Sequence, residues 1–137
     1  MLNSDFKSVL TEEERAAAIA LRLALEPLRS VNPHMPLSHI VTFLEVAIDE
    51  GQGVAEYAKK LEISPTVMTP NLLDVGDRNR MKEPGLGLIT QERDILDLRR
   101  HNAKVTPKGK GVLHKVLMSF KMRKAGDGNR SVGQDRG

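Results

Sequence analysis

The sequence predicts a mainly α-helical protein with a small β-hairpin wing, arranged as a winged helix-turn-helix. Three observations predict this class. Aromatic residues are scarce, with three Phe, one Tyr and no Trp, so the core has to be built from aliphatic side chains. Apolar residues recur at helical spacing over most of residues 11–76. Two short segments within residues 87–105 have the alternating pattern of paired strands.

The composition limits what this chain of 137 residues can be. Its length suits one domain with tails. The absence of cysteine excludes disulfides, thiol redox sensing and cysteine-ligated metals. No apolar run reaches the roughly 18–20 residues that cross a bilayer, and the polar, acidic N-terminus has no secretory signal. We therefore expect a cytoplasmic protein without a membrane partner.

The net charge of +3 conceals an asymmetry along the chain. Residues 1–97 hold 10 Lys and Arg against 16 Asp and Glu, a balance of −6. Residues 98–137 hold 11 against 2, a balance of +9. A basic block beside an acidic body indicates either a polyanionic partner or a solvated tail, and charge alone does not decide between them.

The first helix is expected over residues 11–30, after a flexible lead-in over residues 1–10. Thr11 and Glu14 have the spacing of a capping box, in which each side chain bonds the other residue's amide. Pro27 is expected to kink or end the helix. The helix is apolar around most of its circumference, so it has to be covered from several sides. Either a partner subunit covers it, which we favour, or it is the central helix of a monomer.

The helix-turn-helix and wing are expected within residues 37–106. A helix over Leu37–Glu50 ends at a glycine break, and a short helix over Val54–Leu61 follows. In the first of these, polar positions such as Thr42 are expected outside an apolar stripe that faces the core. That predicted stripe consists of Leu37, Ile40, Val41, Leu44 and Ile48.

The stretch Leu61–Gly76 is predicted to supply the turn and the second helix of the motif. Ser64 is the expected N-cap and Pro65 the first helical residue. A buried stripe is predicted from the i, i+4, i+7 spacing of Met68, Leu72 and Val75. The residues that then face outward are Pro65, Thr66, Thr69 and Leu73. This outer face has no Arg or Lys, and Pro70 lies inside the helix, where proline tends to kink or end it.

Strands are predicted over residues 87–93 and 101–105, followed by a helix over residues 107–124. Thr106 is its expected N-cap and Pro107 its first residue. Its predicted buried face consists of Val112, Leu113, Val116, Leu117 and Phe120. The Gly-rich, polar residues 125–137 are expected to form a disordered tail.

This order of elements resembles the MarR family of winged-helix regulators. The segments that carry the resemblance are SHIVTFLEVAIDEGQGVAEYAKKLEIS and GLGLITQERDILDLRRHNAKVTPKG. Within the second segment, Asp97 and Arg99 fall on the family's Asp-x-Arg, and Thr106 and Gly109 fall on its Thr-x-x-Gly. The resemblance implies a homodimer joined through the first and last helices that binds a palindromic site in double-stranded DNA. It also implies a small-molecule effector as a candidate partner.

Three departures from the family pattern bear on these expectations. Glu62 stands in the turn where glycine is common, and Pro70 stands where the family often has a basic residue. The stretch between Lys108 and Lys124 is shorter than the family's C-terminal region often is, which bears on the dimer. The second hypothesis is therefore a winged-helix protein-interaction module or a non-specific nucleic-acid binder.

The expected DNA contacts come from the predicted recognition helix, its end and the wing. Arg99 is expected at the minor groove, held by a charge-assisted pair with Asp97; the alternative is a solvated charged turn. Thr66 and Thr69 can bond phosphates or base edges, and Asn71 can read adenine only if the helix turns it outward. The full set is Ser64, Thr66, Thr69, Asn71, Arg78, Arg80, Arg99, Arg100 and Lys104.

Catalytic and metal-binding motifs are not signalled. The four histidines, His34, His39, His101 and His114, are not paired at i+3 or i+4. No Ser/His/Asp motif and no phosphate-binding glycine loop is present. We expect a protein that is not an enzyme and that needs no metal or cofactor.

Overall fold

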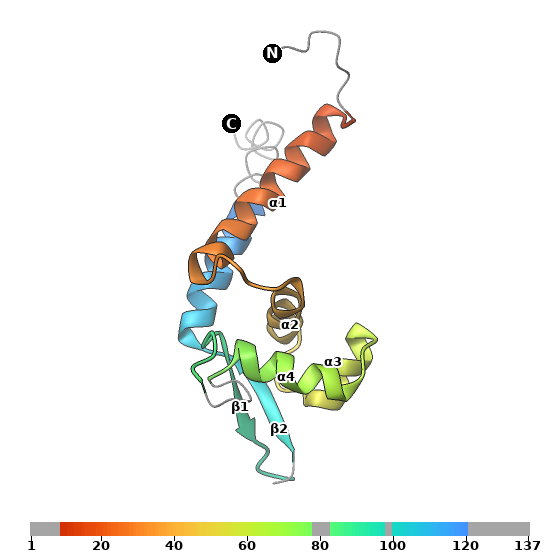
Figure 1. Cartoon of the computed structure of the whole chain (residues 1–137), viewed down its shortest axis with the longest axis vertical. Coiled ribbons are helices and arrows are strands. Elements are labelled where there is room, and N and C mark those ends of the chain that lie inside the picture. The colour runs from red at the N-terminus through yellow and green to blue at the C-terminus, as the bar shows by residue number, and fades with distance from the viewer. Residues whose placement is uncertain (1–8, 78–82, 98–99, 121–137) are drawn as a thin grey trace, which may run out of the picture.

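The computed structural model describes residues 9–77, 83–97 and 100–120. It contains α1 (Glu12–Val31), α2 (Leu37–Ile48), α3 (Val54–Leu61), α4 (Pro65–Val75), β1 (Ile89–Arg93) and β2 (His101–Val105). Residues 107–120 form a further helix, called the C-terminal helix below. In Figure 1, α1 and the C-terminal helix lie at one end of the molecule and the hairpin reaches the other, with α2, α3 and α4 between. The predicted lead-in before residue 9 and the tail over residues 125–137 lie outside the described residues.

Helix α1 begins where the sequence predicts. Thr11 Oγ1 accepts a hydrogen bond from the Glu14 amide at 3.1 Å, and the Glu14 carboxylate accepts one from the Thr11 amide at 2.9 Å. Of the two effects expected of Pro27, a kink or an end of the helix, the end does not occur, because α1 continues to Val31. A proline this close to the C-terminus removes one backbone donor, and the turn beyond it still closes through the Asn32 amide and the Leu28 carbonyl at 3.1 Å.

The face of α2 that packs into the core differs from the predicted one. Thr42, Phe43 and Val46 are buried, whereas Leu37 and Ile48 are 74% and 75% exposed. Ile40 and Leu44 of the predicted stripe are half-buried and pack against the core, so the prediction is wrong for Leu37, Ile48 and Thr42 but not for the whole stripe. The apolar arc of α2 is wider than one face, so its spacing is compatible with more than one inward direction. The face that packs is the one that buries the large Phe43 ring completely.

Helix α4 confirms the predicted pattern. The Ser64 hydroxyl accepts from the Val67 amide at 3.3 Å, and Pro65 is the first helical residue. The predicted stripe is at most 1% exposed, and it belongs to the main core cluster. The helix continues past Pro70 to Val75, so this proline does not end it. The members of the stripe are Met68, Leu72 and Val75.

The two strands form an antiparallel hairpin in which Ile89 pairs with Val105 and Arg93 with His101. The second strand has the predicted bounds, and the first begins two residues later than predicted. The next residue, Thr106, caps the C-terminal helix: its hydroxyl accepts from the Gly109 amide at 3.0 Å and donates to the Gly87 carbonyl at 2.6 Å.

Gly109 lets the C-terminal helix lie directly against the start of the hairpin. A Cβ at this position would collide with the Leu88 carbonyl oxygen, so only glycine fits without a backbone shift. The face predicted to be buried on this helix is only partly so, since Val116 is buried but Leu117 and Phe120 are 43% and 44% exposed in the single chain. The predicted end of this helix, residues 121–124, lies outside the described residues.

Replacing Glu62 with glycine should stabilise the protein. Glu62 ends α3 in the left-handed conformation, with φ of 57° and ψ of 43°. This conformation costs an L-residue roughly 1–2 kcal/mol, which the greater freedom of glycine in the unfolded chain partly offsets. We expect Glu62→Gly to raise the free energy of unfolding by about 0.5–1 kcal/mol, measured by urea titration at one fixed protein concentration. The matched control, Lys59→Gly within α3, should lower the free energy of unfolding by about 1 kcal/mol. A loss of stability in both variants would contradict the left-handed conformation of Glu62.

Candidate nucleic-acid interface

The outer face of α4 carries small polar groups. Thr66 and Thr69 are exposed on it, opposite the buried stripe. Ser64 is exposed too, but its hydroxyl already accepts the Val67 amide and serves as the cap. Asn71 is half-buried and lies about 140° round the helix from Thr66, at about 100° per residue. The structure therefore brings Thr66 and Thr69 together and leaves Asn71 off this face.

A hollow of about 580 Å³ separates α4 from the wing. Thr69 and Leu73 of α4 line one side, and Gln91, Arg100 and His101 of the wing line the other. The start of α3 closes it through Gly53, Val54, Ala55 and Glu56. The predicted recognition helix and the wing thus border one concave surface.

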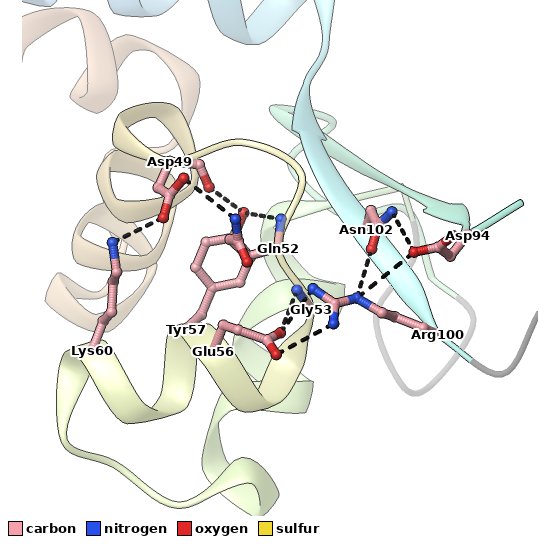
Figure 2. A network of polar contacts seen from close by, with 9 residues as sticks. All are labelled: Asp49, Gln52, Gly53, Glu56, Tyr57, Lys60, Asp94, Arg100 and Asn102. Carbon is pink, nitrogen blue, oxygen red and sulfur yellow. Dashed lines mark hydrogen bonds and ion pairs between the residues drawn. The ribbon is translucent and has the colours of Figure 1, made fainter. Parts of the chain in front are cut away.

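Arg100 joins the wing to α3. Figure 2 shows its guanidinium reaching from the start of β2 to the Glu56 carboxylate, with distances of 3.2 and 3.4 Å between the two pairs of atoms. Its Nε donates to Asn102 Oδ1 at 3.1 Å and lies 3.9 Å from Asp94 Oδ2. The other Glu56 contact is the Gly53 amide, at 2.8 Å. Arg100, predicted to contact a phosphate, is therefore held by two carboxylates within the molecule.

The polar contacts continue beyond Gly53, where Tyr57 and Lys60 of α3 bond Asp49 at the end of α2. The hydroxyl of the buried Tyr57 donates to the Asp49 carbonyl at 2.7 Å and accepts from the Gln52 amide at 3.3 Å (Figure 2). Burial raises the pKa of Tyr57. Lys60 donates to the Asp49 carboxylate at 2.9 Å, which lowers the pKa of Asp49 and raises that of Lys60. These contacts fix the geometry of the turn from which α3 begins.

Asp94 organises the turn at the end of β1. Its Oδ1 accepts from the amides of Leu96 and Asp97 at 2.8 and 3.3 Å, and its Oδ2 accepts from Asn102 Nδ2 at 3.2 Å. The Leu96 amide, followed by the Asn102 side chain, lowers the pKa of Asp94. The carboxylate is therefore occupied by donors of its own loop.

Of the other basic residues predicted to contact DNA, Lys104 is paired within the molecule and three lie outside the described residues. Lys104 lies 3.3 Å from the Glu92 carboxylate across the hairpin, with both side chains more than half exposed. Such a surface pair is weak and can exchange for a phosphate contact. The Asp97 amide and carbonyl take part in the wing turn. Three predicted contacts, Arg78, Arg80 and Arg99, lie outside the described residues.

Several residues of this site were not predicted from the sequence. Glu56 is signalled only by its place three residues after Gly53, the spacing of a capping box. The roles of Asp94 and Asn102 depend on pairing across the hairpin, which no local pattern reveals. Ile95 and Leu96, which are 91% and 96% exposed at the wing turn, are marked only as an aliphatic pair between two aspartates.

Residues 9–77, 83–97 and 100–120 contain neither a candidate metal site nor a helix able to span a membrane. No three His, Asp or Glu side chains there are grouped so as to hold a metal ion. The described helices include none that is both long and apolar enough to cross a membrane.

Neutralising Asp94 should flatten the acid dependence of stability. The pKa of Asp94 lies below its ordinary value of 3.8, so its contribution to stability is complete above about pH 4 and is lost as the pH falls through the lower, folded-state pKa. Asn at position 94 keeps an oxygen for the Leu96 amide but does not titrate. We expect unfolding free energies measured between pH 6 and about pH 2 to fall less steeply for Asp94→Asn than for the native chain. If the two curves of unfolding free energy against pH are parallel, the Asp94 carboxylate does not contribute to the acid dependence of stability.

Comparison with known proteins supports the fold assignment. No protein-family model and no curated protein matches the sequence. Among solved structures, the transcriptional regulator Tm0710 from Thermotoga maritima is similar over 89% of this chain and 78% of its own, with a TM-score of 0.62 and 14% identity. A MarR transcriptional regulator from Methanosarcina mazei covers 80% of this chain and 72% of its own, with a TM-score of 0.56 and 12% identity.

A third similar structure is that of a mutant of S. aureus MepR bound to an oligodeoxyribonucleotide. It covers 90% of this chain and 86% of its own, with a TM-score of 0.59 and 17% identity. At these identities the likeness concerns the fold. The chain accordingly has the winged-helix fold of MarR-type regulators.

Proposed function

We propose that this chain is a homodimeric transcriptional regulator that binds a palindromic site in double-stranded DNA. The observation that carries the proposal is the geometry of α4, a continuous helix whose outer face presents Thr66 and Thr69, the second of which lines the hollow between α4 and the wing. A helix of this size fits the major groove, where hydroxyl groups can bond base edges or phosphates. The likeness to a protein solved with an oligodeoxyribonucleotide supports the same class. We also propose a cytoplasmic location and a small-molecule effector, and we assign no residues to either.

The charge on α4 is compatible with a duplex. The outer face contains no Asp or Glu among residues 65–73, and the nearby Asp74 carboxylate is turned toward His39 Nε2 at 3.3 Å. Because α4 has no basic residue either, most phosphate contacts must come from its flanks. We assign them to Lys104, Arg78 and Arg80, and we propose that Arg99, oriented by Asp97, reaches the minor groove.

Exposed apolar side chains support the dimer. Leu21, Leu23 and Leu25 of α1 are 40–52% exposed, and Leu117 and Phe120 add to them from the C-terminal helix. Apolar residues at this density on two neighbouring helices suit an interface between subunits. With both subunits present, two α4 helices would lie about one DNA turn apart, roughly 34 Å.

A protein-interaction module or a non-specific nucleic-acid binder is the second candidate. The internal pairing of Arg100 and Lys104 favours it, because paired cations attract DNA less strongly. Selection of bound sequences from random duplexes separates the two functions. An enriched palindrome supports the regulator, whereas bound duplexes without one support the non-specific binder, and no bound duplex supports the protein module.

A negative charge on the outer face of α4 should weaken specific binding. Thr66→Glu would place a carboxylate against the duplex, and we expect affinity for the selected site to fall by at least roughly tenfold, since like charges in contact cost several kcal/mol. Ser38→Glu, on exposed α2, is the matched control and should bind like the native chain. If mobility-shift titrations of Thr66→Glu and the native chain are equal, α4 is not part of the DNA interface.

In the same mobility-shift titrations, Arg99→Ala should weaken DNA binding by at least about tenfold at low salt.

Charged substitutions on α1 should separate the subunits. We expect the native chain to sediment at twice 15.2 kDa at micromolar concentration, and the double variant Leu21→Glu, Leu25→Glu to sediment as a monomer, because the interface would then bury unpaired charges. The control is Leu37→Glu on α2, where the same residue type is more exposed, at 74% against 52% for Leu21 and 40% for Leu25. A native chain that is only monomeric would refute the dimer while leaving the DNA proposal to the selection experiment.

A further inference from the structure

The turn of the wing holds two adjacent aliphatic side chains in open solvent. Ile95 and Leu96 are 91% and 96% exposed, more than any other large hydrophobic residue that the structure describes. An isolated exposed leucine needs no explanation. Two neighbouring ones at the end of a projecting hairpin form a small apolar surface, called the apolar tip below.

The apolar tip stands on a well-bonded turn. The Asp94 carboxylate accepts the amides of Leu96 and Asp97, and Asn102 anchors it from β2. The backbone closes around it, since the Asp94 amide donates to the Arg100 carbonyl at 2.8 Å and the Arg100 amide to the Asp97 carbonyl at 2.9 Å. This turn holds both aliphatic side chains outward rather than letting them fold back onto the hairpin.

The apolar tip is continuous with the proposed DNA-binding surface. Arg100, which lies against Asp94 at the turn, also lines the hollow bordered by Thr69 of α4. Figure 1 shows the hairpin projecting from the α4 region away from α1. A duplex whose major groove receives α4 would therefore pass along the hairpin toward its turn.

The charges around the tip do not prevent this approach. The Asp94 carboxylate is bound by amides of its own turn and by Asn102, with Arg100 3.9 Å away. Glu92 is paired with Lys104 at 3.3 Å. Asp97, which follows Leu96, is exposed as well, and its amide and carbonyl are bonded within the turn. Two of the three carboxylates near the apolar tip are thus engaged by the contacts described above.

The geometry points to Ile95 and Leu96 as an apolar wedge that enters the minor groove of the duplex bound by α4 and bends it. Aliphatic side chains have no groups for base-edge hydrogen bonds, but they can separate stacked base pairs and kink the helix axis. The preferred target is a flexible pyrimidine–purine step flanking the site contacted by α4. This inference rests on the proposed function and adds to it a contact that does not involve phosphates.

The test uses the full chain and the duplex enriched by selection. Affinity is measured by fluorescence anisotropy at several salt concentrations, and bending by energy transfer between dyes on the duplex ends. We expect Ile95→Ser with Leu96→Ser to bind at least about tenfold more weakly and to bend the duplex less, because apolar contacts are lost. The slope of log affinity against log salt should not change, because no phosphate contact is removed.

Two further variants make the test specific. Exchange of the two side chains, Ile95→Leu with Leu96→Ile, keeps the tip apolar and should bind and bend like the native chain. Leu37→Ser with Ile48→Ser removes two aliphatic groups of 74% and 75% exposure from α2 and should also behave like the native chain. Circular dichroism establishes that all variants are folded.

The outcomes separate the wedge from the underlying function. If the native chain binds duplex DNA and the double serine variant binds and bends it equally well, the wedge is refuted and the regulator stands. A loss of affinity with a shallower salt slope also refutes the wedge, because it would mean that phosphate contacts had been displaced. If the native chain binds no duplex, both proposals fall.

Discussion

The burial of one side of α4 determines how the whole surface is presented. Met68, Leu72 and Val75 are at most 1% exposed, and each is worth roughly 1.5–3 kcal/mol in the core. Rotating the helix by a single residue, about 100°, would bring part of this stripe into water. The outward position of Thr66 and Thr69 is therefore fixed by the apolar residues behind them. This packing also explains why Pro70 is tolerated, since tertiary contacts hold both halves of the helix.

The base and turn of the wing are held by different forces. At the base, Ile89 is fully buried and Gly109 brings the C-terminal helix against Leu88, so the hairpin cannot shift without disturbing the core. Nearer the turn, Arg100 is held by Glu56 with both side chains more than one-third exposed. Ion pairs this exposed contribute at most about 1 kcal/mol. The base of the wing is therefore held rigidly by the core, whereas the Arg100–Glu56 pair nearer the turn is weak enough for a bound partner to displace.

Local signals in the sequence were enough to predict the elements but not every face or contact. The caps at Thr11, Ser64 and Thr106 depend on residues within one turn, so their hydrogen bonds could be predicted. The inward face of α2 could be predicted only in part, because its apolar residues cover an arc wider than one face and tertiary packing selects among them. The Arg100–Glu56 pair joins residues 44 positions apart, and its prediction requires the three-dimensional arrangement of the wing and α3. Periodicity therefore specifies elements, whereas tertiary packing specifies which groups meet.

Internal pairing has two electrostatic consequences that bear on recognition. It holds Arg100 within the molecule and engages Lys104 in an exposed, weak pair, and it also pairs Glu56, Asp94 and Glu92, whose carboxylates would otherwise repel the phosphates of the proposed duplex. The +9 balance of residues 98–137 includes Arg100 and Lys104, so a balance of +7 remains as a longer-range attraction for the proposed duplex once these two pairs are discounted. Attraction from that block does not depend on base sequence. If the chain binds duplex DNA as proposed, discrimination between sequences has to come from short-range contacts of hydroxyl and aliphatic groups, which are the groups that α4 and the wing turn present.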